Sequence, residues 1–468
     1  MQTVKTDTVV LGGGPAGYVA AIRLGQLGVD TVLIEKDTLG GVCLNRGCIP
    51  SKALISSASK YLAVKNGLSF GIQGGEHLTM NMEILQQHKN TVVKKLTQGV
   101  ASLLKQNKIR VISGNGVFKS HKSIVINGDE TEVVFSKAMI CTGSEPVRIS
   151  GITVDGVKII ESDHALDLDY IPESMTVLGG GVIGVELGEF YASIGTRVTI
   201  VEAMDQILPG MDKTAIKMLT RHLKKMGIAV MTDTRLKSAV IEGDEVTQIV
   251  TKGETETTLK SEVLLVTVGR KPSLKGCNLA SIGIDENAPF IEVNEKCETG
   301  IDGIYAAGDV TGGILLAHKA SHQALVAAEN IAGNVSTFNP DAVPAICYSM
   351  PEFATCGLTP ETAMEAGYDV DTGKFPFAAN GRALATGETE GFVQVVSDKK
   401  TGVILGAQIL HAEAGELLTE FTLAVEKKMK FFEIGHVIHP HPTLSEALME
   451  ASLDCNNSAL HIPPSRSR

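Results

Sequence analysis

An internal repeat dominates the pattern of apolar and polar positions along the chain. Residues 8–36, TVVLGGGPAGYVAAIRLGQLGVDTVLIEK, align without a gap on residues 175–203, MTVLGGGVIGVELGEFYASIGTRVTIVEA. Each copy predicts an apolar strand, a glycine-rich turn, a helix of about four turns and a second apolar strand that ends in glutamate. This order opens a dinucleotide-binding βαβ unit, so we expect two Rossmann-like domains.

Three later apolar strands run into glycine and are expected to complete these domains; they lie at 137–144, 263–272 and 301–310. The interval 45–114 has a helical pattern, whereas 117–135 and 236–260 alternate in the manner of antiparallel strands. The pattern therefore predicts the α/β class, with helical and antiparallel insertions that elaborate each nucleotide-binding fold.

Each glycine-rich turn supplies three glycines with separate roles. In the order of these roles the pairs are Gly12 and Gly179, Gly14 and Gly181, and Gly17 and Gly184. The first permits the tight turn, the second lets a pyrophosphate approach the backbone at the helix N-terminus, and the third lets the helix press on the strand. One such turn alone is also an ordinary strand–helix connection, but here the full context occurs twice.

Glu35 and Glu202 each stand 23 residues after the first glycine of their turn. At this offset a carboxylate accepts hydrogen bonds from a ribose 2′-hydroxyl and repels a 2′-phosphate. No arginine follows Glu202, where the chain continues Ala203, Met204 and Asp205. The second site is therefore predicted to prefer NAD to NADP.

The segment GGVCLNRGCIPSK, residues 40–52, carries the candidate chemistry. Cys43 and Cys48 are four residues apart, unlike the CxxC of zinc knuckles, and this spacing favours a redox disulfide. Pro50 suits the first turn of a helix, so Cys48 is expected at a helix N-terminus that stabilises a thiolate. Lys52 follows one turn later and can lower the pKa of that thiol. The alternative is a pair of buried, unreactive cysteines.

The C-terminal stretch HVIHPHPTLSEALMEA holds three histidines, His436, His439 and His441. A metal site is not expected, because the prolines on both sides of His441 prevent the histidines from sharing one helical face. His441 is predicted to be an acid–base group whose other ring nitrogen is held by Glu446. The alternative is a histidine that merely caps the following helix.

Composition excludes several classes of protein. The 468 residues carry a net charge of −11 without a long basic run, which argues against a nucleic-acid partner. No apolar run approaches the roughly 20 residues that span a bilayer, so no membrane span is expected. Residues 1–8 lack the features of a secretory signal, and the eight cysteines are too scattered for a disulfide framework. We therefore expect a cytoplasmic protein.

Together, GGVCLNRGCIPSK, the two GGGxxG turns, AAGD at 306–309 and HPHPTLSE at 439–446 resemble the pyridine nucleotide-disulfide oxidoreductases, and within them the dihydrolipoamide dehydrogenases, through nearly the whole chain. The resemblance implies FAD at the first nucleotide site, NAD at the second and a C-terminal α+β interface domain for dimerisation. The implied domains are an FAD-binding domain at 1–147, an NAD-binding domain at 148–272, a central domain completing the FAD site at 273–343 and the interface domain at 344–468.

The resemblance also implies residue roles. Cys43 would exchange with the substrate thiol, Cys48 would contact the flavin, and Lys52 and Glu186 would form a pair beside the flavin and nicotinamide. Further FAD positions would be Gly116, Gly143, Asp309, Leu315, Leu316, Ala317 and His318. Further NAD positions would be Gly179 to Glu186, Glu202 and Gly269.

The implied reaction is the oxidation of dihydrolipoamide by NAD+. The substrate would be carried on an acyltransferase or a lipoyl carrier protein, in 2-oxo acid dehydrogenase complexes or the glycine cleavage system. His441 would reach the disulfide from the partner subunit, so a homodimer with two shared active sites is expected.

Other activities remain alternatives. A glutathione-type reductase would need NADP-binding arginines after the second turn, and a mercuric reductase would need a C-terminal cysteine pair where this chain has Cys455. A thiol-independent diaphorase or transhydrogenase, and a non-catalytic assembly subunit, also stay open. The chain departs from the expected pattern at Ser321–Gln323, which lack acidic residues, and at Met350, where histidine is commoner.

Overall fold

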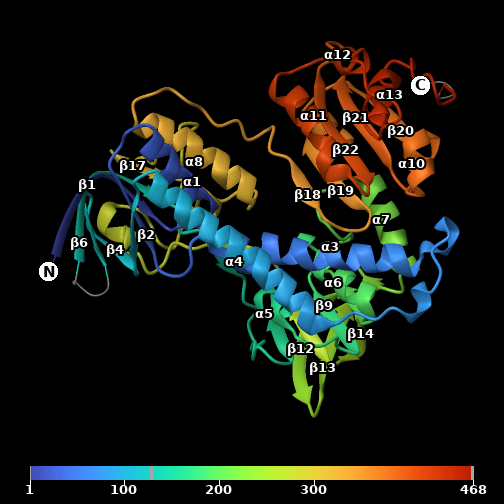
Figure 1. Cartoon of the computed structure of the whole chain (residues 1–468), viewed down its shortest axis with the longest axis horizontal. Coiled ribbons are helices and arrows are strands. Elements are labelled where there is room, and N and C mark those ends of the chain that lie inside the picture. Colours follow the sequence, from blue (N-terminus) through green and yellow to red (C-terminus); the bar gives the residue numbers. More distant parts are fainter. Residues whose placement is uncertain (1, 127–130, 465–468) are drawn as a thin grey trace.

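The computed structural model describes residues 2–126 and 131–464 (Figure 1). Residues 127–130, inside the stretch predicted to alternate, lie outside the described residues, as do Met1 and 465–468 at the outer limits of the first and last predicted domains. Figure 1 shows the amino-terminal sheet on one side, the second sheet below the long helices α3 (Cys48–Lys65) and α4 (Met82–Gln106), and the C-terminal sheet at the opposite end.

The first βαβ unit forms a seven-stranded sheet in the order β3-β2-β1-β6-β5-β4, with β17 paired to β6. Its strands are β1 (Gln2–Leu11), β2 (Thr31–Glu35), β3 (Arg110–Ser113), β4 (Gly116–Ser120), β5 (Ser123–Ile126), β6 (Thr131–Ile140) and β17 (Ile304–Ala306). The strands β3, β2, β1, β6 and β17 run parallel, whereas β5 pairs antiparallel with both β6 and β4. The predicted strands at 137–144 and 301–310 thus complete this sheet.

Helices cover the first sheet and reach towards the second. The helix after the first glycine turn, α1 (Pro15–Gln26), packs on α8 (Ala317–Ile331). The predicted helical interval 45–114 contains α3 (Cys48–Lys65) and α4 (Met82–Gln106), and α2 (Gly41–Arg46) begins just before it. The prediction is wrong at the end of the interval, where β3 pairs with β2 and extends the first sheet. Because α3 also packs on α6 (Val182–Ile194) of the second unit, residues at its N-terminus lie between the two nucleotide-type folds.

The second unit repeats the pattern in a parallel five-stranded sheet, β11-β10-β9-β15-β8. These strands are β8 (Ile159–Glu161), β9 (Ser174–Leu178), β10 (Arg197–Val201), β11 (Ala229–Met231) and β15 (Val263–Val266). Its helices are α5 (Ser162–Asp167), α6 (Val182–Ile194) and α7 (Lys213–Lys225), and its antiparallel insertion is β12 (Arg235–Glu242), β13 (Glu245–Lys252) and β14 (Thr255–Ser261).

A short two-stranded ribbon connects the two units. The apolar run predicted as one strand at 263–272 divides into β15 and β16 (Arg270–Pro272), because the chain turns at Gly269, where φ is +111°. β16 pairs antiparallel with β7 (Ser144–Pro146), which follows the first sheet. The ends of both nucleotide-type folds are therefore tied together beside the cavity described below.

The C-terminal part is an α+β unit with its own core. Its antiparallel sheet has the order β18-β19-β22-β21-β20. The strands are β18 (Ala345–Cys347), β19 (Glu352–Gly357), β20 (Val370–Pro376), β21 (Phe392–Asp398) and β22 (Ile404–His411). The helices are α9 (Pro360–Glu365), α10 (Gly381–Thr386), α11 (Ala414–Glu426), α12 (Phe431–Gly435) and α13 (Glu446–Asp454).

The predicted α/β class, with two Rossmann-like units and a C-terminal α+β unit, is confirmed. The predicted domain limits stay a prediction; residues 274–310 share a hydrophobic cluster with the first sheet, through Leu279, Ile291 and Ile304 among others. Within the described residues, no helix is both long and apolar enough to cross a membrane.

Candidate active site

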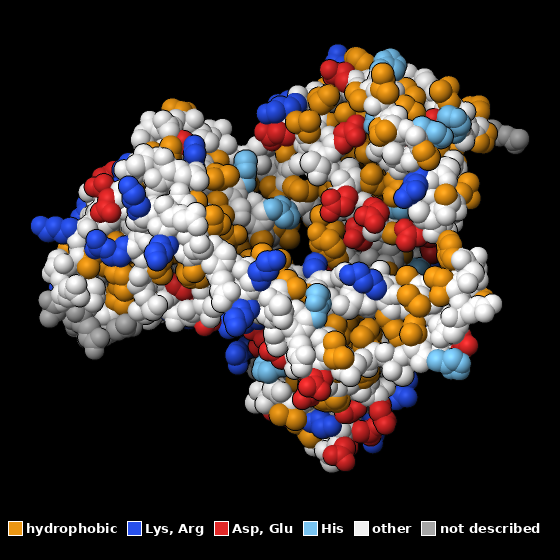
Figure 2. All heavy atoms as spheres, viewed as in Figure 1, with side chains coloured by type: hydrophobic (Ala, Val, Ile, Leu, Met, Phe, Trp, Pro, Cys, Tyr) orange, Lys and Arg blue, Asp and Glu red, His pale blue; other side chains and the backbone are white. Residues whose placement is uncertain are grey.

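A cavity of about 1340 Å³ runs between the two glycine turns and past the cysteine loop. Figure 2 shows a hollow in this face of the molecule, between the amino-terminal part and the C-terminal part. Most predicted site residues line this cavity: Gly12, Gly14, Glu35, Cys43, Cys48, Lys52, Gly116, Gly143, Gly179, Gly181, Glu186, Glu202, Gly269, Asp309, Leu315, Leu316, Ala317 and His318. Its volume exceeds the roughly 300–1,000 Å³ of a common small-ligand pocket.

Gly17 and Gly184 lie behind the lining, where the helices press on the strands. A Cβ at Gly17 would lie 1.7 Å from the carbonyl oxygen of Gly12, and one at Gly184 would lie 2.0 Å from that of Gly179. In front of the second turn, a Cβ at Gly181 would meet no atom within 4 Å in the described chain. The second turn is therefore tightly packed at Gly184 and has free space at Gly181, next to the N-terminus of α6. Free space at a helix N-terminus is the arrangement that binds a phosphate.

Glu35 and Glu202 hold their glycine turns in the same way. Oε2 of Glu35 accepts the N–H of Gly13 at 2.5 Å, and Oε2 of Glu202 accepts that of Gly180 at 2.7 Å. Their Oε1 atoms accept N–H groups two residues later, at 2.7 Å and 2.8 Å. Because each carboxylate oxygen has further lone pairs, both glutamates can still accept a ribose hydroxyl.

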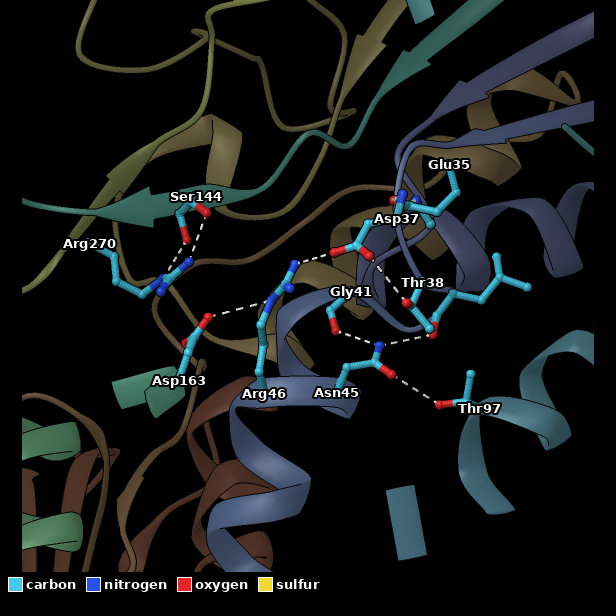
Figure 3. A network of polar contacts seen from close by, with 12 residues as sticks. Glu35, Asp37, Thr38, Gly41, Asn45, Arg46, Thr97, Ser144, Asp163 and Arg270 are labelled. Carbon is cyan, nitrogen blue, oxygen red and sulfur yellow. Dashed lines mark hydrogen bonds and ion pairs between the residues drawn. The ribbon is translucent and has the colours of Figure 1, made fainter. Parts of the chain in front are cut away.

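The cysteine loop spans α2 and the start of α3, and both of its cysteines are thiols in the structure. Figure 3 shows how the loop is fixed. The side-chain amide of Asn45 donates to the carbonyl of Gly41 at 2.9 Å and accepts the Thr97 hydroxyl at 3.2 Å. Arg46 lies between Asp37, at 2.5 Å, and Asp163 of α5, at 3.6 Å. The loop is therefore tied to both nucleotide-type units.

The two thiols are electrostatically distinct. Cys48 is the first residue of α3, as the position of Pro50 predicted. Its hydrogen bond with Cys43 lowers the pKa of Cys48; burial opposes this, while the Lys52 ammonium and the Cys48 N–H lower the pKa further. The same hydrogen bond, followed by burial, raises the pKa of Cys43. Between the two, Cys48 is the thiol that carries the negative charge.

Lys52 and Glu186 form an ion pair at the cavity wall. Nζ of Lys52 lies 2.7 Å from Oε2 of Glu186 and 4.6 Å from the ring centroid of Tyr348. Burial lowers the pKa of Lys52, but the Glu186 carboxylate outweighs it and leaves the pKa raised. Lys52 is therefore a stable cation one helical turn from Cys48.

Three cavity residues were missed by the sequence analysis. Tyr348 contacts Lys52 as described, and its N–H donates to Oε1 of Glu186 at 2.9 Å. Arg270 donates to the Ser144 hydroxyl at 2.9 Å (Figure 3), and that hydroxyl donates to Asp309 at 2.6 Å. The one sequence signal for two of these residues is their position: Ser144 follows Gly143 and Arg270 follows Gly269, each at the end of a predicted strand.

His441 and Glu446 lie apart from the cavity within one chain, and neither is among the described residues that line it. Nδ1 of His441 lies 2.9 Å from Oε1 of Glu446, whose Oε2 accepts the N–H of Thr443 at 2.9 Å. Burial raises the pKa of Glu446, but the Thr443 N–H and His441 outweigh it and leave the pKa lowered. An ionised Glu446 favours the ring orientation in which Nδ1 donates to the carboxylate and Nε2 points away from it.

The other histidines of this stretch do not form a metal centre. The side chain of His439 is 4% exposed, and its Nε2 contacts Glu420 at 3.2 Å, so the fold holds this side chain in place. Across residues 2–126 and 131–464 there is no group of three or more His, Cys, Asp or Glu side chains suited to a metal ion.

Comparison with known proteins agrees with this geometry. Residues 6–324 match the family described as pyridine nucleotide-disulphide oxidoreductase, and residues 343–452 match the dimerisation domain of that family. A dihydrolipoyl dehydrogenase of Geobacillus stearothermophilus is 44% identical over 463 residues, with 98% of each chain covered. One of Bacillus subtilis is 42% identical over 464 residues, again with 98% of each covered.

Solved structures give the same result. LpdA of Mycobacterium tuberculosis superposes with a TM-score of 0.89 at 26% identity, covering 96% of this chain and 99% of that one. The HOCl-induced flavoprotein disulfide reductase RclA of Escherichia coli gives 0.83 at 28% identity, covering 95% and 99%. From the matched glycine turns to the C-terminal unit, the chain belongs to the pyridine nucleotide-disulphide oxidoreductase family.

Proposed function

We propose that the protein is a dihydrolipoyl dehydrogenase, which oxidises dihydrolipoamide with NAD+ by way of a Cys43–Cys48 disulfide and FAD. The observation that carries this proposal is the position of the two thiols, at the N-terminus of α3, inside a cavity that both glycine turns share. Full-length relatives with this activity in their names support the choice of substrate.

The residues of the cavity fit the two cofactors. FAD would be held by the first turn, Glu35, Asp309 and residues 315–318, and NAD by the second turn, Glu202 and Gly269. The open space in front of Gly181 and the glutamate that follows each turn support this fit. The chemistry that bound FAD would supply is two-electron transfer between the dithiol and NAD+.

The protein's own residues carry out the thiol exchange. One thiolate of the substrate attacks Sγ of Cys43 in the disulfide, and Cys48 leaves as a thiolate. The second substrate thiolate then breaks the mixed disulfide, which releases lipoamide and leaves both protein cysteines reduced. Lys52 and the start of α3 stabilise the Cys48 thiolate, which would be the electron donor to the cofactor.

His441 is proposed to take the substrate's proton on Nε2, with Nδ1 held by Glu446. Because His441 lies away from the cysteines of its own chain, we place it in the active site of a second subunit. The match of residues 343–452 to a dimerisation domain supports the homodimer. The proposed substrate is a lipoyl group on an acyltransferase or lipoyl carrier protein, and the proposed location is the cytoplasm.

The test is NADH formation from dihydrolipoamide by the purified holoenzyme, with the Cys43→Ser and Cys48→Ser variants as controls. We expect turnover with NAD+, at least tenfold less with NADP+ because Glu202 repels a 2′-phosphate, and loss of turnover in both variants. Turnover that survives Cys43→Ser would instead establish a thiol-independent diaphorase, and a wild-type protein without turnover would favour a non-catalytic subunit.

A further inference from the structure

Glu189 is a buried acid that the proposed reaction does not use. It lies on α6 one turn after Glu186, and it is 1% exposed. Its Oε2 accepts the N–H of Met350 at 3.0 Å, whereas its Oε1 has no hydrogen-bond partner in the described parts of the chain. A buried carboxylate with an unsatisfied oxygen is costly when ionised, so this environment favours the neutral acid.

Glu186 and Glu189 bind the same short segment, Tyr348–Met350, which follows β18. Glu186 accepts the N–H of Tyr348 at 2.9 Å, and Glu189 accepts that of Met350 at 3.0 Å. The segment carries the Tyr348 ring, which lies 4.6 Å from Nζ of Lys52. The positions of Tyr348 and of the ion pair therefore depend on both glutamates.

The charged groups near Glu186 and Glu189 come from four elements. Burial raises the pKa of Glu189 to about 8; the Met350 N–H opposes this, and Glu186 on the same helix adds to the rise. Cys347 of β18 is buried, and both glutamates further raise its pKa. Lys52 of α3 is already engaged by Glu186.

Glu352 of β19 adds a further acid to this region. Burial raises its pKa to about 7, with Glu186 among the smaller causes. Figure 2 shows acidic side chains gathered between α3 and the C-terminal sheet. A negative charge on Glu189 would therefore lie near that of Glu186, whose ammonium partner Lys52 is already paired.

We propose that Glu189, kept as a neutral carboxylic acid, is a positioning residue that holds Tyr348–Met350 against the Lys52–Glu186 pair. This inference rests on the proposed function, because it assumes that the pair lies beside the flavin and nicotinamide. Ionised Glu189 would repel Glu186, three residues away on one helical face, and would draw water into the contact. The nicotinamide step then slows, while thiol exchange at Cys43 does not.

Two substitutions separate the hydrogen bond from the charge. Glu189→Gln keeps an oxygen that accepts the Met350 N–H but cannot ionise, so its flavin is expected to be reduced by NADH at a rate that stays level above pH 8. Glu189→Leu removes the acceptor, and the same rate should fall about fivefold at every pH, the factor that the loss of one hydrogen bond corresponds to. A rate of flavin reduction by NADH that is retained in Glu189→Gln and lowered in Glu189→Leu would show that Glu189 acts through its hydrogen bond to Met350 and not by filling space.

The experiment uses the holoenzyme in two separate half-reactions, flavin reduction by NADH and flavin reduction by dihydrolipoamide, each against pH. The infrared C=O stretch of a protonated carboxylic acid, taken as wild type minus Glu189→Gln, reports the state of Glu189 without turnover. We expect this band at neutral pH and its loss as the wild-type NADH rate falls, with dihydrolipoamide rates unaffected by the substitutions.

A missing infrared band, or a Glu189→Gln profile that still falls with the wild type, overturns the inference. If Glu189→Leu does not fold, the Gln variant and the infrared band still decide it. A wild type that NADH reduces and dihydrolipoamide does not would contradict the proposed function alone, because the NADH half-reaction tests Glu189 whatever the thiol substrate is.

Discussion

Nζ of Lys52 and Oε2 of Glu186 lie 2.7 Å apart, and this ion pair joins α3, which begins with Cys48, to α6, which follows the second glycine turn. The pair places a fixed cation beside the thiol that carries the negative charge. It also connects the redox loop to the nicotinamide-type fold.

Replacing Lys52 with Met is expected to raise the pKa of Cys48 by about 1 unit or more, because the opposite charge that favours the thiolate is removed. The measurement is the pH dependence of thiolate ultraviolet absorbance in the reduced protein, with the Cys48→Ser variant subtracted. Lys60→Met, at an exposed position of the same helix, is the matched control. An unchanged titration in Lys52→Met would show that Lys52 does not act on Cys48.

Two alanine substitutions at the second glycine turn should separate folding from binding: Gly184→Ala should lower stability, and Gly181→Ala should weaken NADH binding. Gly184→Ala places a methyl group 2.0 Å from the Gly179 carbonyl, so it should destabilise the protein by on the order of 2 kcal/mol. Gly181→Ala meets no atom of the described chain within 4 Å, so the melting temperature should be retained. Its methyl group would still occupy the phosphate space and weaken NADH binding, which calorimetry would measure. Normal NADH affinity in Gly181→Ala would place the nucleotide elsewhere.

The pH dependence of stability should report the buried Glu189. Glutamate in an unfolded chain titrates near pH ~4.3, whereas burial raises the pKa of Glu189 to about 8 in the folded chain. The stability carried by the protonated form is therefore complete below about pH 4.3 and is lost progressively as the pH rises to about 8. Glu189→Gln should thus melt at a higher temperature than the wild type at pH 8.5, and the difference should shrink in acid.

Glu450 offers a control for this stability experiment. It is 2% exposed, but Oε1 contacts His461 at 2.6 Å and Oε2 accepts the N–H of Leu460 at 2.8 Å. Because both oxygens are satisfied, Glu450→Gln should lower the melting temperature instead of raising it at alkaline pH. A Glu189→Gln variant that behaves in the same way as Glu450→Gln would contradict the neutral state of Glu189.

Shared active sites predict complementation between inactive subunits. Cys43→Ser and His441→Gln should each abolish turnover, because one lacks the exchanging thiol and the other the acid–base group. When both are coexpressed, random pairing makes half of the dimers mixed, and each mixed dimer has one intact site, so about a quarter of wild-type activity should return. Coexpressed subunits that stay inactive would show that His441 serves its own chain or has no catalytic role.

The sequence predicted most of the fold because its signals are local. The strand, turn and helix of each unit follow from apolar periodicity and from glycines that the packing requires, such as Gly17 behind the first turn. Pro50 likewise predicted that a helix begins at Cys48. The alignment of residues 8–36 with 175–203 predicted two equivalent units, and the structure contains both.

The residues that sequence analysis missed are those whose partners are distant in the chain. Ser144 contacts Arg270 across 126 positions, and Tyr348 contacts Glu186 across 162. Glu189 escaped notice because α6 is buried on most of its faces, so the local pattern does not separate an acid facing protein from one facing solvent. Such contacts follow from tertiary packing and not from any local motif.

Anaerobic titration of the holoenzyme with dihydrolipoamide tests the central claim most directly, with visible absorption followed in the wild type and in Cys48→Ser. The account predicts a long-wavelength thiolate–flavin band in the wild type and none in the variant, because the Cys48 thiolate lies at the cavity that would hold the ring. A band that persists in Cys48→Ser, or a wild type that dihydrolipoamide leaves unchanged, would contradict it.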